Sequence, residues 1–510
     1  MATGPSSSTP WLYRFSVWVV ILLGCLVSTV MARRANSKDT SGGNVQVALA
    51  SATALLVGYW MTSPTKEETK TEYPAVNKDK TLIWREDEGI SKLVPLHPRG
   101  AEDPTILKKY TMAEVAKRDS PAEAWIIIDE RVYDITNFVA KHPGGELVLY
   151  NMAGKDCTDA FANYHQAAIY KKWLPPYLIG QVTDVPVYPH VQDFRDIRQE
   201  LLRKGLFETN PVFYYKMYAW YATLFFSSLY LTLKCQSTAA HMLGAAFMGM
   251  FWQQLAGWGH DMGHSSITHN CQYDNFVGST LGCAILGFGV GWWKRSHNTH
   301  HVVCNSIEND PDIQHMPLMA VTPEILKAPF WSTYHKKVVV ADAAARFFVS
   351  YQHWFFPLLL AAGRFNLYAL SWILPLTAHK QDAIVMHNIG MDTYHGNAYN
   401  DESDEWYKMQ IKTTMNVDCY EWLDWFHIGL QFQTEHHLYP TLPRHNLRIA
   451  RLMAQQVCKK HGIQYNETTF FQGVIKTVLH MRATALECRK GTFDYQASTS
   501  LIRDLLNANG

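Results

Sequence analysis

The chain has 510 residues, with 46 lysines and arginines against 45 aspartates and glutamates, and a formal net charge of +1. This length exceeds one ordinary domain, and the balanced charge gives no reason to expect a nucleic acid partner. Apolar residues make up 47% and aromatic residues 13% of the chain, which suits a soluble module joined to a membrane body. Nine cysteines without a CxxC pair predict reduced thiols rather than disulfides.

Two apolar runs, at residues 15–31 and 44–62, open the chain. Each could be a signal-peptide core, a membrane anchor or a short interfacial segment. The positive-inside rule places the basic residues between the two runs in the cytosol. Residues 63–104 are charged and contain prolines, so that we expect residues 1–104 to form apolar N-terminal segments followed by a linker.

Residues 105–185 have the texture of a small soluble α+β domain, with the strand-like stretch AWIIIDERVYDIT followed by KHPGG. In KHPGG, a proline ends the local helix and two glycines let the backbone turn tightly against a flat ligand. A second histidine follows in DAFANYHQ. Two imidazoles from opposing hairpins can fill both axial positions of a heme iron and exclude oxygen from it. The predicted heme contacts are His142, His165, Pro143, Gly144 and Gly145.

Beyond a second linker, predicted at 186–214, the chain becomes apolar. The apolar stretches lie at residues 215–233, 238–258, 276–293 and 354–376. The first two are long enough to cross a bilayer. The third is Gly-rich and predicts an interfacial, re-entrant or buried core helix. After Arg448 the sequence is mixed and polar, and we expect helices exposed to the cytosol.

Three histidine clusters accompany these apolar stretches, as HDMGH, HNTHH and QTEHH. Six of the 23 histidines lie within residues 260–301, far more than an even spread would place there. Residues spaced i, i+3 and i+4 share one face of a helix, where their side chains can grip one ion. The predicted ligands are His260 and His264, then His297, His300 and His301, and finally Gln433, His436 and His437.

Zinc proteolysis is the first alternative for HDMGH, because HExxH carries a glutamate base between two zinc ligands. An aspartate, which is one methylene shorter, occupies that place here, and the protease motif has no use for two further clusters. Tetrahedral zinc takes four ligands, whereas seven histidines and a glutamine suit two ions. Nitrogen-rich ligation beside an apolar cavity suits iron and oxygen chemistry. We expect Asp261 and Glu435 to orient neighbouring imidazoles by accepting their second N–H.

With these boxes and the HPGG module, residues 105–460 resemble the front-end family of membrane desaturases, which carry an N-terminal cytochrome b5 domain. Gln433 stands where other desaturases have a histidine. Details of the sequence are most similar to the Δ8 sphingolipid long-chain-base desaturases, namely GVGWWKRSHNTHHVVCNSIENDPDIQHMP and WLDWFHIGLQFQTEHHLYPTLPRHNLR. The main alternative within the family is a Δ5 or Δ6 fatty acyl desaturase.

The resemblance implies a cytochrome b5-like α+β domain followed by an all-α polytopic membrane domain at 215–460, with its histidine-box helices in the cytosol, and a cytosolic tail at 461–510. It implies heme b, two non-heme iron ions, O2 as co-substrate, and His387 as a further metal ligand. The implied partners are a membrane lipid substrate and NADH-cytochrome b5 reductase. The implied location is the endoplasmic reticulum membrane, with several crossings and the heme domain and boxes facing the cytosol.

One departure from the family concerns the junction near residues 377–382. The family has two more membrane helices between the segments that match LYALSWILPL and AIVMHNIG, whereas only TAHKQD joins them here. Loss of a helical hairpin preserves sidedness, because two crossings cancel, but it removes part of the wall around the substrate channel. The alternative from another functional class is therefore an inactive, membrane-anchored heme electron carrier.

Overall fold

The computed structural model describes residues 107–165, 167–287, 289–377, 391–396, 398–399 and 402–491. The expected apolar segments at 15–31 and 44–62, the first linker and His387 lie outside the described residues. The described chain forms two compact units. One comprises Asn210–Leu255, and the other comprises the residues up to Thr209 and from Ala256 onward.

The smaller unit consists of helix α8, Pro211–Lys234, and the first part of α9, Thr238–Gly263. Gly244 allows the two helices to approach closely, because a Cβ at this position would lie 2.7 Å from Thr232 Oγ1. The Ser228 hydroxyl donates to the Gly244 carbonyl at 2.6 Å. Helices thus occur at the first two predicted apolar stretches. Within the described residues, no helix combines the length and hydropathy that a membrane crossing requires.

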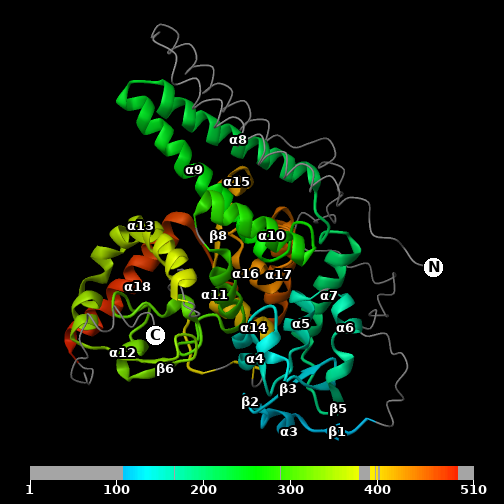
Figure 1. The fold of residues 1–510 in the computed structure, drawn as a ribbon. Helices are drawn as coiled ribbons and strands as arrows, with labels where there is room; N and C mark the ends of the chain where they lie inside the picture. The colour runs from blue at the N-terminus through cyan, green and yellow to red at the C-terminus, as the bar shows by residue number, and fades with distance from the viewer. Residues whose placement is uncertain are drawn as a thin grey trace. The chain divides into compact units, whose positions relative to one another are not determined.

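The second unit begins with a small α+β module, drawn in blue to cyan in Figure 1. Its five-stranded sheet has the order β1-β5-β4-β3-β2, in which β1 runs parallel to β5 and the other pairs are antiparallel. Asp129 and Glu130 join β3 to β4 with φ angles of 50° and 61°, the left-handed backbone of a tight hairpin turn. The strands are β1 (Lys109–Tyr110), β2 (Asp119–Ser120), β3 (Glu123–Ile128), β4 (Arg131–Asp134) and β5 (Leu178–Val182).

Short helices pack against both faces of this sheet, and two of them carry the predicted heme ligands at their ends. The helices of the module are α3 (Met112–Ala116), η2 (Val139–Lys141), α4 (Glu146–Met152), α5 (Thr158–Tyr164), α6 (Ala167–Lys172) and η3 (Pro175–Tyr177). The strand-like stretch at 124–136 is confirmed as the β3–β4 hairpin, and the α+β prediction for this module is confirmed.

The rest of the second unit is mainly helical, with two small ladders, β6 (Phe330–Ser332) with β7 (Lys337–Val339) and β8 (Asn416–Asp418) with β9 (Glu467–Thr469). The helices are α7 (Pro189–Arg203), the end of α9, α10 (Cys271–Leu281), η4 (Gly282–Leu286), α11 (Val290–Val303), η5 (Pro311–Ile313), α12 (Glu324–Lys327), α13 (Ala343–Thr377), α14 (Trp406–Thr413), η6 (Glu421–Leu423), α15 (Asp424–His427), α16 (Gln433–Leu438), η7 (Arg444–Asn446), α17 (Leu447–His461) and α18 (Phe470–Lys490).

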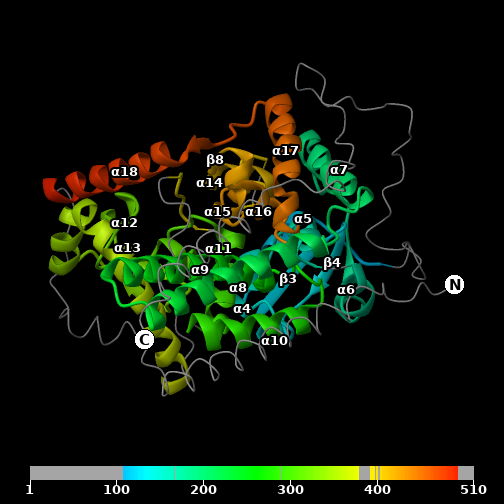
Figure 2. The same cartoon turned by 90° about the horizontal axis from the view of Figure 1, so that it is seen from above.

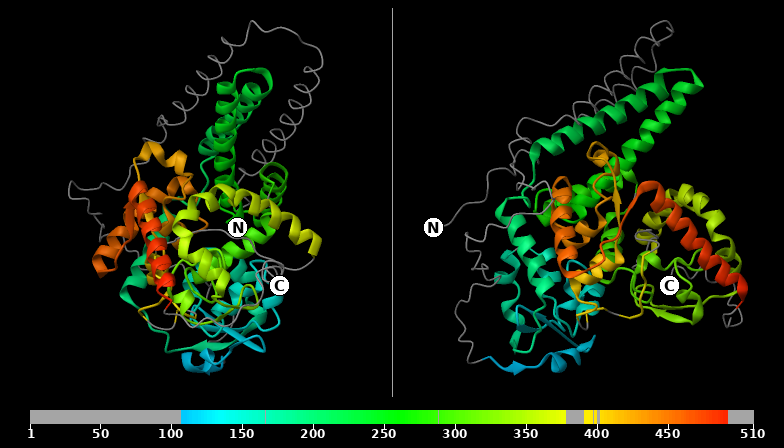
Figure 3. Two further views of the ribbon diagram at one scale, coloured as in Figure 1. Left: turned by 90° about the vertical axis from the view of Figure 1, so that its left-hand side faces the viewer. Right: turned by 180° about the vertical axis from the view of Figure 1, so that it is seen from behind.

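Two predicted segments differ from the structure, and a third, the tail, contains a helix as predicted after Arg448. Residues 186–214, expected to be a linker, contain the 15-residue helix α7, whose Phe194, Ile197 and Leu201 are fully buried. Helix α7 runs beside α17 (Figure 2). The apolar stretch 276–293 is divided between α10, η4 and the start of α11. The tail expected from residue 461 contains α18, which packs along α13 (Figure 3).

One hydrophobic core joins the α+β module to the helices that carry the histidine boxes. From the module it includes Ile126 and Tyr133, and from the helical part it includes Val303 on α11, Phe432 before α16 and Leu447 on α17. Apolar side chains on all these elements are therefore removed from water together, which stabilises their arrangement. The module is thus part of the folded body of the second unit.

Gly180 in β5 provides a test of how tightly the module's sheet is packed. A Cβ at this position would lie 2.4 Å from the Lys108 carbonyl oxygen and 2.5 Å from the Tyr110 ring, so that β1 would have to move. We expect Gly180→Ala to destabilise the module by about 1–3 kcal/mol, the usual cost of overpacking. The measurement is thermal unfolding followed by heme absorption. The control is Gly249→Ala, where a Cβ meets nothing within 4 Å; equal melting of the two variants would contradict the prediction.

Candidate heme pocket and metal centre

The loop after η2 fixes the imidazole of His142. The ring nitrogen Nδ1 lies 3.0 Å from the Gly145 carbonyl oxygen, and the same loop is closed by a backbone hydrogen bond from Gly145 N to His142 O at 3.0 Å. Gly145 has a φ of 100°, a conformation that only glycine adopts readily. A Cβ on Gly144 would lie 2.7 Å from His142 Cε1. Pro143, Gly144 and Gly145 therefore form the turn that the KHPGG motif predicts.

His165 follows the last residue of α5 and faces His142. Its Nδ1 lies 3.2 Å from the Phe161 carbonyl oxygen, and its ring stacks on the Phe161 ring with centroids 4.1 Å apart. The centroids of the His142 and His165 rings are 6.1 Å apart. Two metal–imidazole bonds of about 2 Å each, added to the distance from each nitrogen to its ring centre, span roughly this separation. With Nδ1 of each ring on a carbonyl, Nε2 is the atom for an iron between them.

Burial keeps both of these imidazoles neutral. It lowers the pKa of His165 to about 4, with the nearby His142 adding to the effect, and it lowers the pKa of His142 as well. Only the neutral ring binds a metal, so both side chains are in the ligand form at physiological pH. The residues that are present thus fit a heme held from both faces.

The three histidine boxes meet in one buried cluster. His260 and His264 come from the last turn of α9, His297 and His301 from α11, and His436 from α16. The Nε2 atoms of neighbouring rings lie 3.2 Å apart for His297 and His260, 3.0 Å for His301 and His297, and 3.1 Å for His436 and His301. Four of these residues can place their ligand atoms within 4.8 Å of one another, namely His260, His264, His297 and His436.

A second group of ligand atoms lies beside the first. His300, Cys304 and His437 also bring their ligand atoms within 4.8 Å of one another. The His300 Nδ1 lies 2.9 Å from Asp310 Oδ2, and the His437 Nδ1 lies 3.0 Å from Gln410 Oε1. These contacts fix the ring orientations and make Nε2 the candidate ligand atom of both histidines. A third group, in which His300 lies with Asp310 and Asp312, shares His300 with the second. The histidine clusters are thus compatible with the two ions that the sequence predicts.

Burial and mutual proximity set the protonation of the cluster. Burial lowers the pKa of His264 and of His301 far below the usual value, and neighbouring histidines lower them further. For His300, burial alone would lower the pKa, but the carboxylates of Asp310 and Asp312 outweigh burial and raise it well above the usual value. A metal ion that binds this side chain therefore has to displace a proton.

The two carboxylates predicted to orient imidazoles contact other groups. Asp261 lies 3.9 Å from His260 Nδ1, beyond hydrogen-bond distance, and pairs with Arg444 at 2.8 Å. Glu435 is fully buried and accepts hydrogen bonds from the Asn416 amide at 2.7 Å and the Tyr465 hydroxyl at 2.6 Å. Both residues thus hold the backbone elements that carry the histidines. The expectation that they accept an imidazole N–H stays a prediction.

Asp310 and Gln410 are the residues that take this orienting role, and the sequence analysis did not single them out. Asp310 follows HNTHH in the acidic stretch ENDPD, where its position beside a dense histidine cluster was a usable signal. Gln410 lies on α14, in a segment without any motif. Only its proximity to His437 in the folded chain identifies it.

Gln433 begins α16, and its side-chain amide donates to the Leu430 carbonyl at 2.8 Å. This hydrogen bond uses the nitrogen of the amide, so that the carbonyl oxygen stays the candidate metal donor. The structure places Gln433 on the helix that carries His436 and His437.

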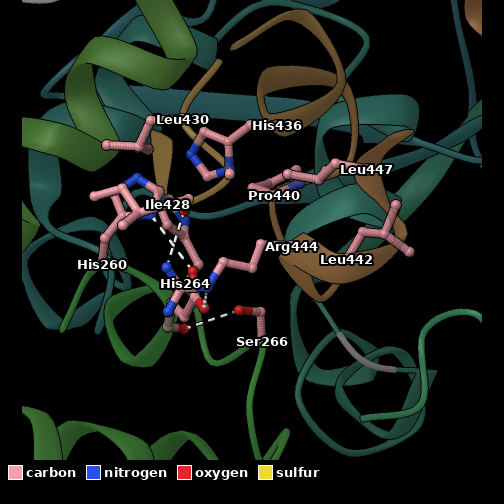
Figure 4. A pocket seen from close by; sticks show the side chains of 12 residues that line it. His260, His264, Ser266, Ile428, Leu430, His436, Pro440, Leu442, Arg444 and Leu447 are labelled. Carbon is pink, nitrogen blue, oxygen red and sulfur yellow. Dashed lines mark hydrogen bonds and ion pairs between the residues drawn. The ribbon is translucent and has the colours of Figure 1, made fainter. Parts of the chain in front are cut away.

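A small pocket adjoins the first group of histidines (Figure 4). His260, His264 and His436 line it, together with the Asp261–Arg444 pair. The remaining lining residues are Ser266, Ile428, Gly429, Leu430, Pro440, Leu442 and Leu447, most of which are apolar. A small molecule in this pocket would therefore meet apolar side chains beside candidate metal ligands.

Comparisons with known proteins agree with this geometry. Residues 111–183 match the family of cytochrome b5-like heme/steroid binding domains, and residues 237–469 match the fatty acid desaturase family. The acyl-lipid (9-3)-desaturase of Borago officinalis is 32% identical over 428 residues, which cover 75% of this chain and 95% of that protein. A Delta(8)-fatty-acid desaturase of the same plant is 31% identical over 449 residues, which cover 79% of this chain and 99% of that protein. A Delta 8-(E)-sphingolipid desaturase of Kluyveromyces lactis is 36% identical over 354 residues, which cover 58% of this chain and 61% of that protein.

Asp310 provides a test of the second group of ligands. Asp310→Asn removes the charge that holds the His300 ring while keeping the size of the side chain. We expect iron affinity to fall about 10–100-fold, the usual effect of losing a carboxylate that orients a metal-bound histidine. Non-heme iron is measured after dialysis against a graded chelator. Glu308→Gln is the control, because Glu308 contacts His395 and Gly396 instead of the cluster; iron retention equal to that control would refute the role of Asp310.

Proposed function

The chain belongs to the fatty acid desaturase family, with a fused cytochrome b5-like domain, and we propose that it inserts the Δ8 double bond into the long-chain base of a sphingolipid. Enzymes of this family are oxygen-dependent oxidoreductases that use heme, two iron ions and O2. One structural observation supports the proposal above all: the heme module and the box helices α11 and α16 contribute apolar side chains to one core, and the three boxes meet in one cluster of histidines.

The sphingolipid substrate is supported by two kinds of evidence. The sequences of residues 289–317 and 422–448 resemble Δ8 long-chain-base desaturases. Relatives from Kluyveromyces lactis and Komagataella phaffii are named Delta 8-(E)-sphingolipid desaturases. Other relatives are named as fatty-acid or acyl-lipid desaturases. A front-end Δ5 or Δ6 fatty acyl desaturase is therefore the second candidate.

When bound, the iron ions and O2 supply an oxidant for unactivated C–H bonds, which no amino acid side chain provides. The chain's own residues hold and shield the two sites. His142 and His165 occupy both faces of the heme pocket and so favour electron transfer over oxygen binding there. The proposed metal ligands of the boxes are His260, His264, His297, His300, His301, Gln433, His436 and His437, and we extend this proposal to His387.

We also propose NADH-cytochrome b5 reductase as the electron source and the endoplasmic reticulum membrane as the location. The heme module and the histidine helices share one core, so both lie on the same side of any membrane that the chain crosses. A reductase that uses NADH reaches them only from the cytosol. Membership of the fatty acid desaturase family and the proposed lipid substrate support attachment to a membrane, and we include several crossings in this proposal.

The test of substrate class is expression in yeast that lacks its own desaturase of long-chain bases, followed by analysis of hydrolysed sphingolipids and total fatty acids. We expect a Δ8-unsaturated long-chain base and unchanged fatty acids. The matched control is His301→Ala, which removes a proposed ligand and should remove the product. An unsaturated fatty acid in place of the long-chain base would favour the second candidate.

Iron content separates the enzyme from an inactive, membrane-anchored heme carrier. By the proposal, each chain holds one heme iron and two non-heme irons. His142→Ala should abolish heme absorption and desaturation while the two non-heme irons remain, because the two sites use different residues. Heme spectra and total iron are measured on the same preparation. If wild-type protein holds iron in heme alone, the chain is a heme carrier and the proposal that it is an enzyme is wrong.

Gln433 provides the last prediction for this site. A glutamine carbonyl binds iron more weakly than imidazole does, and the amide can also donate a hydrogen bond. Gln433→His should therefore retain iron with altered oxygen chemistry, whereas Gln433→Ala should lose activity more severely. If the only role of Gln433 is its hydrogen bond to the Leu430 carbonyl, either substitution lowers the free energy of unfolding by at most about 0.5 kcal/mol. Turnover and bound iron are measured side by side, and wild-type turnover in Gln433→Ala would remove this residue from the metal site.

A further inference from the structure

Helix α11 lies between the heme pocket and the histidine cluster. Its HNTHH motif supplies three histidines to the cluster. Between two of them, the Asn298 side chain donates to the Gly144 carbonyl at 3.4 Å, in the loop that carries His142. One turn earlier, the Arg295 side chain lies 3.8 Å from the place where a Cβ on Gly145 would be. One loop of the heme pocket therefore rests on the same helix that holds the metal ligands.

The second heme ligand is also next to this helix. Tyr164 immediately precedes His165, and its ring meets the His301 ring edge-on, with centroids 6.2 Å apart and an interplanar angle of 88°. The Trp406 ring meets Tyr164 in the same manner at 6.1 Å and 82°. The Tyr164 hydroxyl is buried and has no hydrogen-bond partner among the described residues. The ring, and not the hydroxyl, therefore makes the contact between the two sites.

Helix α5, which places Tyr164 and His165, is fixed against the helical part of the unit by polar contacts. Arg195 on α7 binds Asp159 through two hydrogen bonds of 2.7 and 2.8 Å, and the Tyr407 hydroxyl on α14 donates to the same carboxylate at 3.2 Å. Charge-assisted pairs with this two-bond geometry fix orientation as well as distance. The position of Tyr164 relative to His301 is therefore set by the fold rather than by chance encounter of tethered parts.

We propose that electrons pass from the heme pocket to the metal cluster through the contact of Tyr164 with His301. This inference rests on the proposed function, and it assigns a route within it. In the step, the ferrous heme iron loses one electron and becomes ferric, and one ferric iron of the cluster gains that electron and becomes ferrous. No bond or proton changes place.

In this route, the Tyr164 side chain fills the space between His165 of the heme pocket and His301 of the histidine cluster with closely packed atoms. Protein interiors are packed almost as densely as organic crystals, and a truncated side chain leaves a cavity that its surroundings fill only in part. Electronic coupling between two centres weakens when packed atoms are replaced by a gap. Tyr164 is thus a positioning residue, which acts through His165 on one side and His301 on the other.

The experiment uses the full-length protein loaded with heme and iron, fully oxidised and free of oxygen and lipid substrate. NADH and a cytochrome b5 reductase supply less than one electron per chain, and rapid mixing follows the absorption of reduced heme. In the wild-type protein this absorption rises and then decays as the electron moves to the cluster. In Tyr164→Leu we expect the decay to be roughly tenfold slower, which corresponds to a barrier about 1.4 kcal/mol higher. In Tyr164→Phe, which keeps the ring, we expect the wild-type rate.

Heme spectra and non-heme iron content are measured for every variant, because a purely structural defect would change them and the proposed role does not. Tyr110→Leu is the matched control, since the Tyr110 ring makes an edge-on contact of 5.2 Å with Trp125 in the same module. If Tyr164→Leu loses heme or iron, Tyr164→Met, which fills the space without a ring, replaces it.

Each outcome decides between the alternatives. Decay at the wild-type rate in a Tyr164→Leu protein with full heme and iron would overturn the route. If the absorption of reduced heme decays slowly in Tyr164→Phe as well as in Tyr164→Leu, the hydroxyl and not the ring is required. That result would overturn the route as stated. Absence of decay in wild-type protein that holds two non-heme irons would overturn the proposed function itself.

Discussion

The structure depends on one constraint, which is the burial of seven imidazoles whose ring nitrogens lie about 3 Å apart in several pairs. Neutral rings in this arrangement direct lone pairs or N–H groups at one another with little access to water, and charged rings would repel each other at high cost. Within the described residues, the buried nitrogens His264 Nε2 and His301 Nδ1 have no hydrogen-bond partner. A cation satisfies such a set of nitrogens, so that metal binding and correct packing of the three box helices favour each other.

The surrounding polar network follows from that constraint. Asp310 lies within hydrogen-bond distance of the Nδ1 atom of His300, and Gln410 lies within hydrogen-bond distance of the Nδ1 atom of His437. In both histidines this contact leaves Nε2 to face the proposed metal site. Further from the metal ligands, the ion pair of Asp261 with Arg444 ties the end of α9 to the segment after α16. This buried pair fixes orientation more than it adds stability, because the two charges also lose their hydration. The polar contacts around the cluster thus hold the helices, and a bound cation would hold their histidines.

Fusion of an electron donor to its acceptor is often explained by effective concentration, which depends on the length of a flexible linker. The contacts of this chain support a closer relation. Helix α7 occupies the segment expected to be a linker, and its Arg195 holds the α5 helix of the heme module. The module and the histidine helices also bury apolar side chains in one core. The relevant quantity is therefore a fixed distance between two sites rather than a local concentration.

The sequence was sufficient to predict the heme module and the three histidine boxes, because spacing alone places such residues on one turn or one helix face. It identified the KHPGG turn, in which Gly144 and Gly145 have steric reasons to be glycine. It did not identify Gln410 or the actual partners of Glu435, because contacts between distant segments leave no trace in local periodicity. The linker prediction at 186–214 failed for a related reason: a polar, amphipathic helix such as α7 resembles a linker in composition and differs only in the spacing of its apolar residues.

The short junction after α13 bears on whether the chain can act as an enzyme. Contacts near the end of α11 hold residues 394–396: Ile307 N donates to the Tyr394 carbonyl at 2.9 Å, and the Ser306 hydroxyl donates to the Gly396 carbonyl at 2.6 Å. These bonds fix residues 394–396 whatever the length of the connection before them. The ligand helices α9, α11 and α16 likewise meet through side chains of their own. We therefore expect a shorter connection to leave the ligands on α9, α11 and α16 in place, so that its effect should fall on the wall around a bound lipid and on the proposed ligand His387.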